Sequence, residues 1–276
     1  MTAIAEHLAS CAAAIAGNAF PFWMVVVLLA LLAMGCEHVD FTLGMGCGTA
    51  LTPLLLLMGY DPLDVVPAVL LSELATGTAA ATLHHRAGNV NFGAGNRDLL
   101  IALVLGACSV LGAVIAVFVA TSIPKFYLKL YIGVLVLAMG LIILLLRGRE
   151  GRFSWKRVVG LGVLAAFNKG MSGGGYGPVV TCGQIMSGIT GKRAVGITSL
   201  AEGVTCLVGV LTFIATRGWP NWQLSAPLMC GALCSTPLAA WTVKKISTKK
   251  FTTLIGLTTV VLGALTLGRI LWQLLR

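Results

Sequence analysis

Two carboxylate–threonine pairs lie inside long apolar runs of the chain. Glu73 is followed by Thr76 and Glu202 by Thr205, so each pair is one helical turn apart on the same face of a helix. An ionisable group at such depth is expensive and is a functional hypothesis by default. Because burial favours the neutral carboxylic acid, we predict that Glu73 and Glu202 carry a coupled proton. The alternative is that each carboxylate accepts hydrogen bonds from a neighbouring loop and holds its shape.

Lys169 and Asp40 stand beside two glycine-rich stretches, Gly170–Gly177 and Gly44–Gly48. Lys169 is therefore a candidate charge partner for an anionic substrate. The alternative is a structural ion pair between Asp40 and Lys169. Both roles coexist if the substrate competes with Asp40 for the ammonium group.

A glycine-rich break in a membrane helix exposes backbone groups that lipid cannot satisfy, so protein or a water-filled cavity must cover it. The helix that follows presents free N–H groups and a partial positive charge, which favours an anion. The alternative is that the glycines only allow close helix packing. With the nearby hydroxyl groups, the candidate substrate-binding residues are Gly46, Cys47, Gly48, Thr49, Thr52, Thr76, Asn168, Lys169, Gly175, Tyr176, Gly177, Thr181 and Thr205.

An internal repeat relates these candidates to one another. Residues 44–92 align without a gap with residues 173–221, which lie 129 positions later, and nine positions are identical. The identical residues of the first copy are Gly44, Gly46, Gly48, Thr52, Gly59, Val66, Leu71, Glu73 and Thr76. Many secondary transporters are doubled in this way and hold their substrate where the two copies meet.

The composition is that of an integral membrane protein. The 276 residues are 58% hydrophobic and only 10% charged, whereas soluble domains carry about 25% charge. The apolar runs do not alternate with polar residues as barrel strands do, so we predict an all-α fold. The net charge of +10 comes from basic residues in short loops, which predicts orientation in the membrane and no nucleic-acid partner.

The chain contains six apolar segments that predict ordinary membrane crossings: 65–83, 98–119, 126–146, 194–214, 223–243 and 252–273. Segments 22–59 and 156–188 are too long for one crossing, and each predicts a re-entrant hairpin of two half-helices. The half-helices are expected at Phe22–Met34, Thr49–Met58, Val158–Phe167 and Pro178–Met186. We therefore predict one transmembrane domain with a lead-in at 1–20 and two inverted-topology repeats at 21–150 and 151–276.

The basic residues set the predicted orientation, because cytoplasmic loops carry the Lys/Arg excess. With re-entrant hairpins and both termini outside, 13 basic residues face the cytoplasm and 4 face outward. The outward residues are Lys125, Lys129, Arg217 and Arg276. Treating each hairpin as a single crossing would place the charged loop Arg147–Arg157 outside and remove this bias.

Other polar residues suggest weaker hypotheses. The adjacent His84 and His85 point in different directions on a helix and have no third ligand nearby in sequence, so we expect a capping or interfacial role rather than a metal site. Arg86 is a candidate for recruiting or releasing an anion at the inner mouth. No hydrolase or redox motif occurs. The sequence therefore predicts no catalytic residue, no cofactor and no metal.

Three stretches carry a family resemblance: Gly44–Gly59, Leu83–Phe92 and Gly170–Thr181. They resemble the TauE/SafE family of sulfite and sulfonate exporters. The resemblance implies export of small sulfur-containing or organic anions across the bacterial cytoplasmic membrane, with proton coupling as one mechanism. The chain departs from the family pattern at Cys47 and in the charged segment Cys36–Asp40.

The leading hypothesis is a secondary transporter whose partners are a small anion and the lipid bilayer, with a homo-oligomer left open. One alternative is a passive anion channel or a thiosulfate-type importer that uses Cys47 and Cys182. A rival from another class is an intramembrane metalloenzyme. Its ligands would be Glu37, His38, Asp40 and His84.

Overall fold

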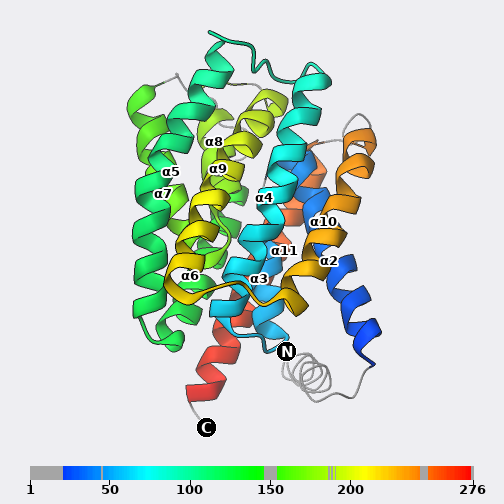
Figure 1. Cartoon of the computed structure of the whole chain (residues 1–276), viewed down its shortest axis with the longest axis vertical. Coiled ribbons are helices and arrows are strands. Elements are labelled where there is room, and N and C mark those ends of the chain that lie inside the picture. The colour runs from blue at the N-terminus through cyan, green and yellow to red at the C-terminus, as the bar shows by residue number, and fades with distance from the viewer. Residues whose placement is uncertain are drawn as a thin grey trace.

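The computed structural model describes residues 21–44, 46–145, 154–185, 187, 189, 191–242 and 248–274, so the predicted lead-in at 1–20 lies outside the described residues. All regular structure in this part of the chain is helical (Figure 1). The helices are α2 (Phe22–Leu43), α3 (Cys47–Leu57), α4 (Pro62–Arg86), α5 (Arg97–Ser122), α6 (Lys125–Leu145), α7 (Trp155–Ser172), α8 (Tyr176–Ile185), α9 (Gly191–Arg217), α10 (Trp222–Thr242) and α11 (Thr248–Leu274). The predicted all-α class is confirmed for the described residues.

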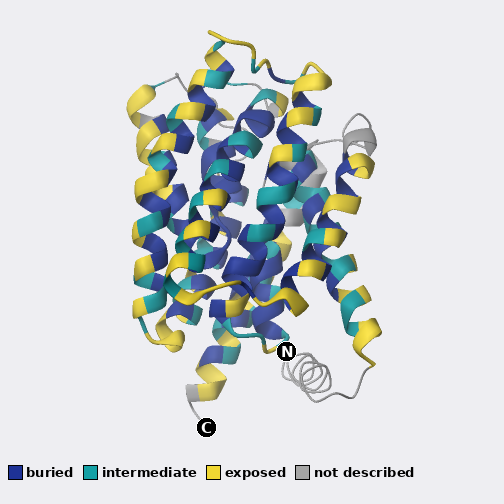
Figure 2. Cartoon of the chain, viewed as in Figure 1, coloured by how far each residue is buried: buried dark blue, intermediate teal, exposed yellow. Residues whose placement is uncertain are grey.

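The outside of the bundle is apolar. Helices α2, α4, α5, α6 and α9 contain spans that are long and apolar enough to cross a membrane. Large hydrophobic side chains such as Leu103, Leu111 and Phe118 on α5 are exposed, and exposed positions recur along the outer helices in Figure 2. A bundle that turns such residues outward, where a soluble protein would bury them, is built for a multi-pass position in lipid.

The six predicted crossings correspond to α4, α5, α6, α9, α10 and α11, with ends that differ by a few residues. The predicted half-helices fit less well. The short returning helices α3 and α8 were expected, but the prediction that the preceding helices end at Met34 and Phe167 is wrong. Helix α2 continues through Gly35 to Leu43, and α7 continues to Ser172. Polar side chains do not interrupt a helix when its backbone bonds stay internal and their own polar groups are buried among protein partners.

The helix ends follow the sequence repeat. Helices α2 and α7 end at Leu43 and Ser172, and α3 and α8 begin at Cys47 and Tyr176; both pairs lie 129 positions apart. Helices of one half pack on those of the other: α2 on α10, α7 on α5, α4 on α9 and α6 on α11. In the view of Figure 1, α4 runs from the lower end to the upper end and α9 runs in the opposite direction.

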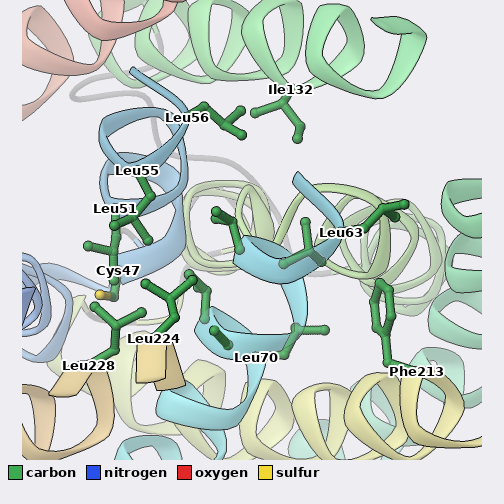
Figure 3. Close-up of a cluster of buried hydrophobic side chains, with 14 of the residues drawn as sticks. Cys47, Leu51, Leu55, Leu56, Leu63, Leu70, Ile132, Phe213, Leu224 and Leu228 are labelled. Carbon is green, nitrogen blue, oxygen red and sulfur yellow. The ribbon is translucent and has the colours of Figure 1, made fainter. Parts of the chain in front are cut away.

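The short helices α3 and α8 lie within two apolar cores. The larger core surrounds α3, whose Leu51 and Leu55 are fully buried among residues of α4, α6, α9 and α10 (Figure 3). The smaller core surrounds Tyr176 and Val180 of α8. Because α3 and α8 contribute to these two cores, the glycine turns that precede the short helices lie in the interior.

Candidate functional site

The two glycine-rich breaks touch one another through their backbones. A Cβ atom added to Gly48 would overlap the carbonyl oxygen of Gly173, and one added to Gly174 would lie 2.7 Å from the carbonyl carbon of Gly48. Real Cβ atoms do not approach backbone atoms so closely. Glycine is therefore required at this crossing, which joins the first half of the chain to the second.

Each break turns the chain with a pair of left-handed glycines. In the first break, Gly44 and Gly46 have φ angles of 64° and 74°, and in the second, Gly173 and Gly175 have φ angles of 71° and 79°. Residues with a side chain rarely adopt such angles. The N–H group of Gly44 donates to the Asp40 carbonyl at 2.6 Å and that of Gly173 to the Lys169 carbonyl at 2.8 Å. Asp40 and Lys169 therefore occupy equivalent positions at the ends of α2 and α7.

Lys169 is completely buried between two glutamates. Its Nζ lies 2.7 Å from Oε1 of Glu202 and forms a second ion pair with Oε2 of Glu73. These are its ion-pair partners among the described residues, in place of the Asp40 partner that the sequence suggested. The two glutamates come from α4 and α9, so one ammonium group joins equivalent positions of both halves.

The carboxylates also hold the first break. The Gly48 N–H group donates to Oε1 of Glu73 at 2.5 Å, and the Gly46 N–H group donates to Oδ1 of Asp40 at 2.7 Å. Glu73 thus accepts a hydrogen bond from the glycine loop, as the structural alternative required. Glu202 instead binds Lys169. The first break is thus held by charged groups, whereas in the second the N–H groups of Gly174 and Gly175 donate to the hydroxyls of Ser172 and Thr49. These backbone N–H groups are therefore not left without a partner in the interior.

A small acidic cavity adjoins the cluster. Its volume is about 10 Å³, close to what a single water molecule needs. Oxygens of Asp40, Glu73 and Glu202 lie within 4.8 Å of one another, a spacing that could hold a metal ion. Oε2 of the buried Glu37 has no hydrogen-bond partner. The cavity is lined by Glu37, Asp40, Phe41, Glu73, Thr76, Gly77, Ala80, Ser199 and Glu202.

The predicted hydroxyl ligands are buried, and most bond to protein. Thr49 accepts a hydrogen bond from the Gly175 N–H group at 3.0 Å, which ties α3 to the second break. Thr205 donates to its own helix and lies 2.5 Å from the hydroxyl of Ser109. Thr76 also donates to its own helix, and Thr181 donates to Thr198. Of the four symmetric threonines, Thr52 has a buried hydroxyl without a partner.

The remaining predicted ligands lie near the two breaks. Asn168 accepts a hydrogen bond from the Tyr131 hydroxyl at 2.6 Å, and Tyr176 is fully buried at the start of α8. The backbone N of Gly177 would lie 3.4 Å from a Cβ atom on Gly46, so the N-terminal ends of α3 and α8 approach each other. Cys47 is buried, whereas the Cys182 side chain lies outside the described residues.

The histidines suggested for a metalloenzyme do not join the acidic cluster. His84 is buried, stacks on Phe41 with a ring-centroid distance of 4.8 Å, and bonds to Asn89 at 3.1 Å. Among the described residues, the group whose ligand atoms converge contains Asp40 with two glutamates and no histidine. The four-residue metal site of that hypothesis is therefore not assembled, and His85 and Arg86 lie at the end of α4.

Several contacting residues were missed from the sequence. Cys206 donates from its thiol to Oε2 of Glu73 at 3.9 Å, and Ser109 reaches Thr205 from α5. A lone serine or cysteine in an apolar run gives no usable signal. Tyr131 does give one, because a buried tyrosine hydroxyl normally finds a partner.

Helices that break in the interior beside a buried charge cluster are typical of membrane transporters. The comparisons with known proteins agree. The family model described as "Sulfite exporter TauE/SafE" matches residues 27–266, so the chain belongs to the TauE/SafE family. It is also 27% identical over 254 residues to the "Probable membrane transporter protein YtnM" of Bacillus subtilis (strain 168), covering 88% of this chain and 82% of that one. No solved structure matches the chain. The protein is a membrane transporter.

Proposed function

We propose that the chain is a secondary transporter that moves a small oxyanion such as sulfite across the bacterial inner membrane. The observation that carries this proposal is Lys169, a buried ammonium group at the crossing of the two breaks. The repeat at a spacing of 129 residues and the opposed directions of α4 and α9 support an inverted-repeat architecture. In such folds the substrate lies between the halves, which rock to expose it alternately.

The ion pairs suggest how protons would be coupled to the anion. Glu73 and Glu202 neutralise Lys169 in the arrangement described above, so an anion must compete with them for the ammonium group. Protonation of either glutamate removes one competitor, because a neutral carboxylic acid pairs weakly with an ammonium ion. The anion and the proton would then enter together, and loss of the proton would expel the anion.

The short helices supply the remaining interactions of the proposed site. Their N-terminal ends carry partial positive charge, and they approach each other at Gly46 and Gly177. The unpartnered hydroxyl of Thr52 lies beside Gly173 and is a further donor. The cavity holds about one water, so the halves must move apart to admit an anion.

The positive-inside rule supports an orientation with both termini outside. In Figure 1 the start of α2 and the end of α11 lie at the same lower end of the bundle. The loops with most of the basic residues would then face the cytoplasm. A homo-oligomer is compatible with this arrangement but is not needed for the proposed site.

Sulfite flux in proteoliposomes tests the proposal. We expect wild-type protein to carry labelled sulfite, and an imposed pH gradient to change the rate of flux. Lys169→Ala should reduce flux to that of protein-free vesicles, whereas the exposed Lys125→Ala should retain it. Flux that is independent of Lys169 would refute the anion site, and flux that ignores the pH gradient would refute proton coupling.

A further inference from the structure

We propose that the acidic cavity beside Glu37 binds a small monovalent cation, with Na⁺ as the probe that identifies it. This site is distinct from the proposed anion partner Lys169, although Glu73 and Glu202 border both. The inference goes beyond the proposed function, because cation binding requires no anion and no transport.

The cluster contains more negative than positive groups. Glu37, Asp40, Glu73 and Glu202 line the cavity, and Lys169 pairs with the last two of these carboxylates. No ion pair among the described residues gives Glu37 or Asp40 a basic partner. Buried charges without a partner are strongly unfavourable. A cation in the cavity would compensate the two carboxylates that form no ion pair with Lys169.

The end of α2 adds to this negative field. A helix C-terminus carries partial negative charge, which favours a cation within the last turn. Helix α7 places Lys169 there, whereas α2 has no basic residue in its last turn and instead carries Asp40, with Glu37 one turn earlier. A cation bound near the end of α2 would therefore supply the positive charge that Lys169 supplies at the end of α7.

An unpartnered oxygen points to a ligand rather than to a tight internal contact. Glu37 is 3% exposed, and its Oε2 has no hydrogen-bond partner although its carboxylate lines the cavity. Hard cations prefer oxygen ligands, which the carboxylates and the hydroxyl groups of Thr76 and Ser199 supply. Mg²⁺ usually keeps several of its waters, and a cavity of about 10 Å³ has no room for them. These features favour a monovalent ion of the size of Na⁺.

The first test is thermal unfolding of the purified full-length protein without any anionic substrate. Na⁺ replaces choline at constant chloride, ionic strength and pH. We expect the unfolding temperature to rise with Na⁺ and to saturate, because a ligand that binds only the folded state stabilises it. Glu37→Gln should weaken the apparent Na⁺ affinity by about tenfold or more. Asp64→Asn, which removes an exposed acid of α4 outside the cavity, should leave the affinity unchanged.

Binding of radioactive Na⁺ to the wild-type protein gives a second measurement if Glu37→Gln fails to fold. One ion should bind per chain, displaced by unlabelled Na⁺ and not by choline. Absence of saturable Na⁺ binding would overturn the proposal, as would equal affinity in a folded Glu37→Gln variant or stabilisation by Ca²⁺ alone. Because no sulfite is present, these failures would leave the proposed anion transport standing. Absence of sulfite flux in a protein that binds Na⁺ would refute the proposed anion transport and leave the cation site standing.

Discussion

The two breaks have the same backbone conformation, but the charged residues at their equivalent positions have opposite signs. Gly44 and Gly173 end α2 and α7 with left-handed turns, and each donates its N–H group to the residue four positions earlier. That residue is Asp40 in the first half and Lys169 in the second. The repeated scaffold therefore presents a carboxylate and an ammonium group at equivalent places, which a chain with two identical halves could not do.

The surroundings of Lys169 compensate its charge more completely than those of Asp40 do. Lys169 suits the negative end of its own helix and is held by one glutamate from each half. The Asp40 carboxylate lies at the negative end of its own helix, which is unfavourable. It accepts a hydrogen bond from the backbone N–H group of Gly46. One half thus supplies a charge with two ion-pair partners, and the other supplies a carboxylate that has no ion-pair partner among the described residues.

Among the variants that test this comparison, removal of Lys169 should have the largest effect on the free energy of unfolding. Lys169→Ala leaves Glu73 and Glu202 buried without their cation, and breaking a buried pair costs about 3–5 kcal/mol. We expect that loss in the free energy of unfolding, measured with denaturant in detergent. Lys125→Ala removes a pair with Asp61 whose lysine is 57% exposed, and it should cost less than about 1 kcal/mol. Equal losses would show that the burial of Lys169 is not what makes its pair strong.

The contact between the breaks can be broken directly. Gly48→Ala would place a Cβ atom onto the Gly173 carbonyl, so we expect a loss of about 1–3 kcal/mol or more from overpacking. Gly35→Ala is the matched control, because it lies within α2 and a Cβ atom there meets nothing within 4 Å. The control should be neutral or stabilising, since alanine is the better helix former. A harmless Gly48→Ala would mean that the two breaks do not touch.

Asp40→Asn should have a smaller effect than either change above. Asparagine keeps an oxygen for the Gly46 N–H group and removes one charge from a cluster crowded with carboxylates. We therefore expect unfolding free energy to change by less than about 1 kcal/mol. A loss as large as that of Lys169→Ala, in the same denaturant measurement, would show that the two equivalent positions are equally neutralised.

The helices of the fold could be predicted from the sequence more fully than the ion pairs of Lys169. The lengths of the apolar runs located the crossings, because a helix needs a fixed number of residues to span a bilayer. The glycine-rich stretches located both breaks, but the first was predicted to begin too early, at Gly35, because the polar side chains that follow suggested an interrupted helix. The glycine pairs that repeat 129 residues apart mark the turns themselves. The meeting of Glu73, Glu202 and Lys169 could not be predicted, because it depends on how α4 crosses α9 near Gly77 and Gly203.

The ion pair between Asp61 and Lys125 at the surface gives the smallest effect. Partial burial tends to raise the pKa of Asp61, but the Lys125 ammonium and the Leu63 N–H group lower it below its usual range. A carboxylate with a lowered pKa stabilises the fold above its unfolded pKa, and that stability is lost as pH falls through the folded value. Asp61→Asn should therefore remove a small, acid-sensitive part of the unfolding free energy. An unchanged pH profile would contradict this.

Sulfite affinity in Glu73→Gln protein tests the central claim that an anion competes with the glutamates for Lys169. Titration calorimetry at a fixed pH compares this variant with wild type, Lys169→Ala and the exposed control Asp64→Asn. The account predicts that Glu73→Gln binds sulfite about tenfold more tightly, because one competitor is lost, and that Lys169→Ala abolishes binding. Weaker binding by Glu73→Gln, or wild-type binding by a folded Lys169→Ala protein, would contradict it.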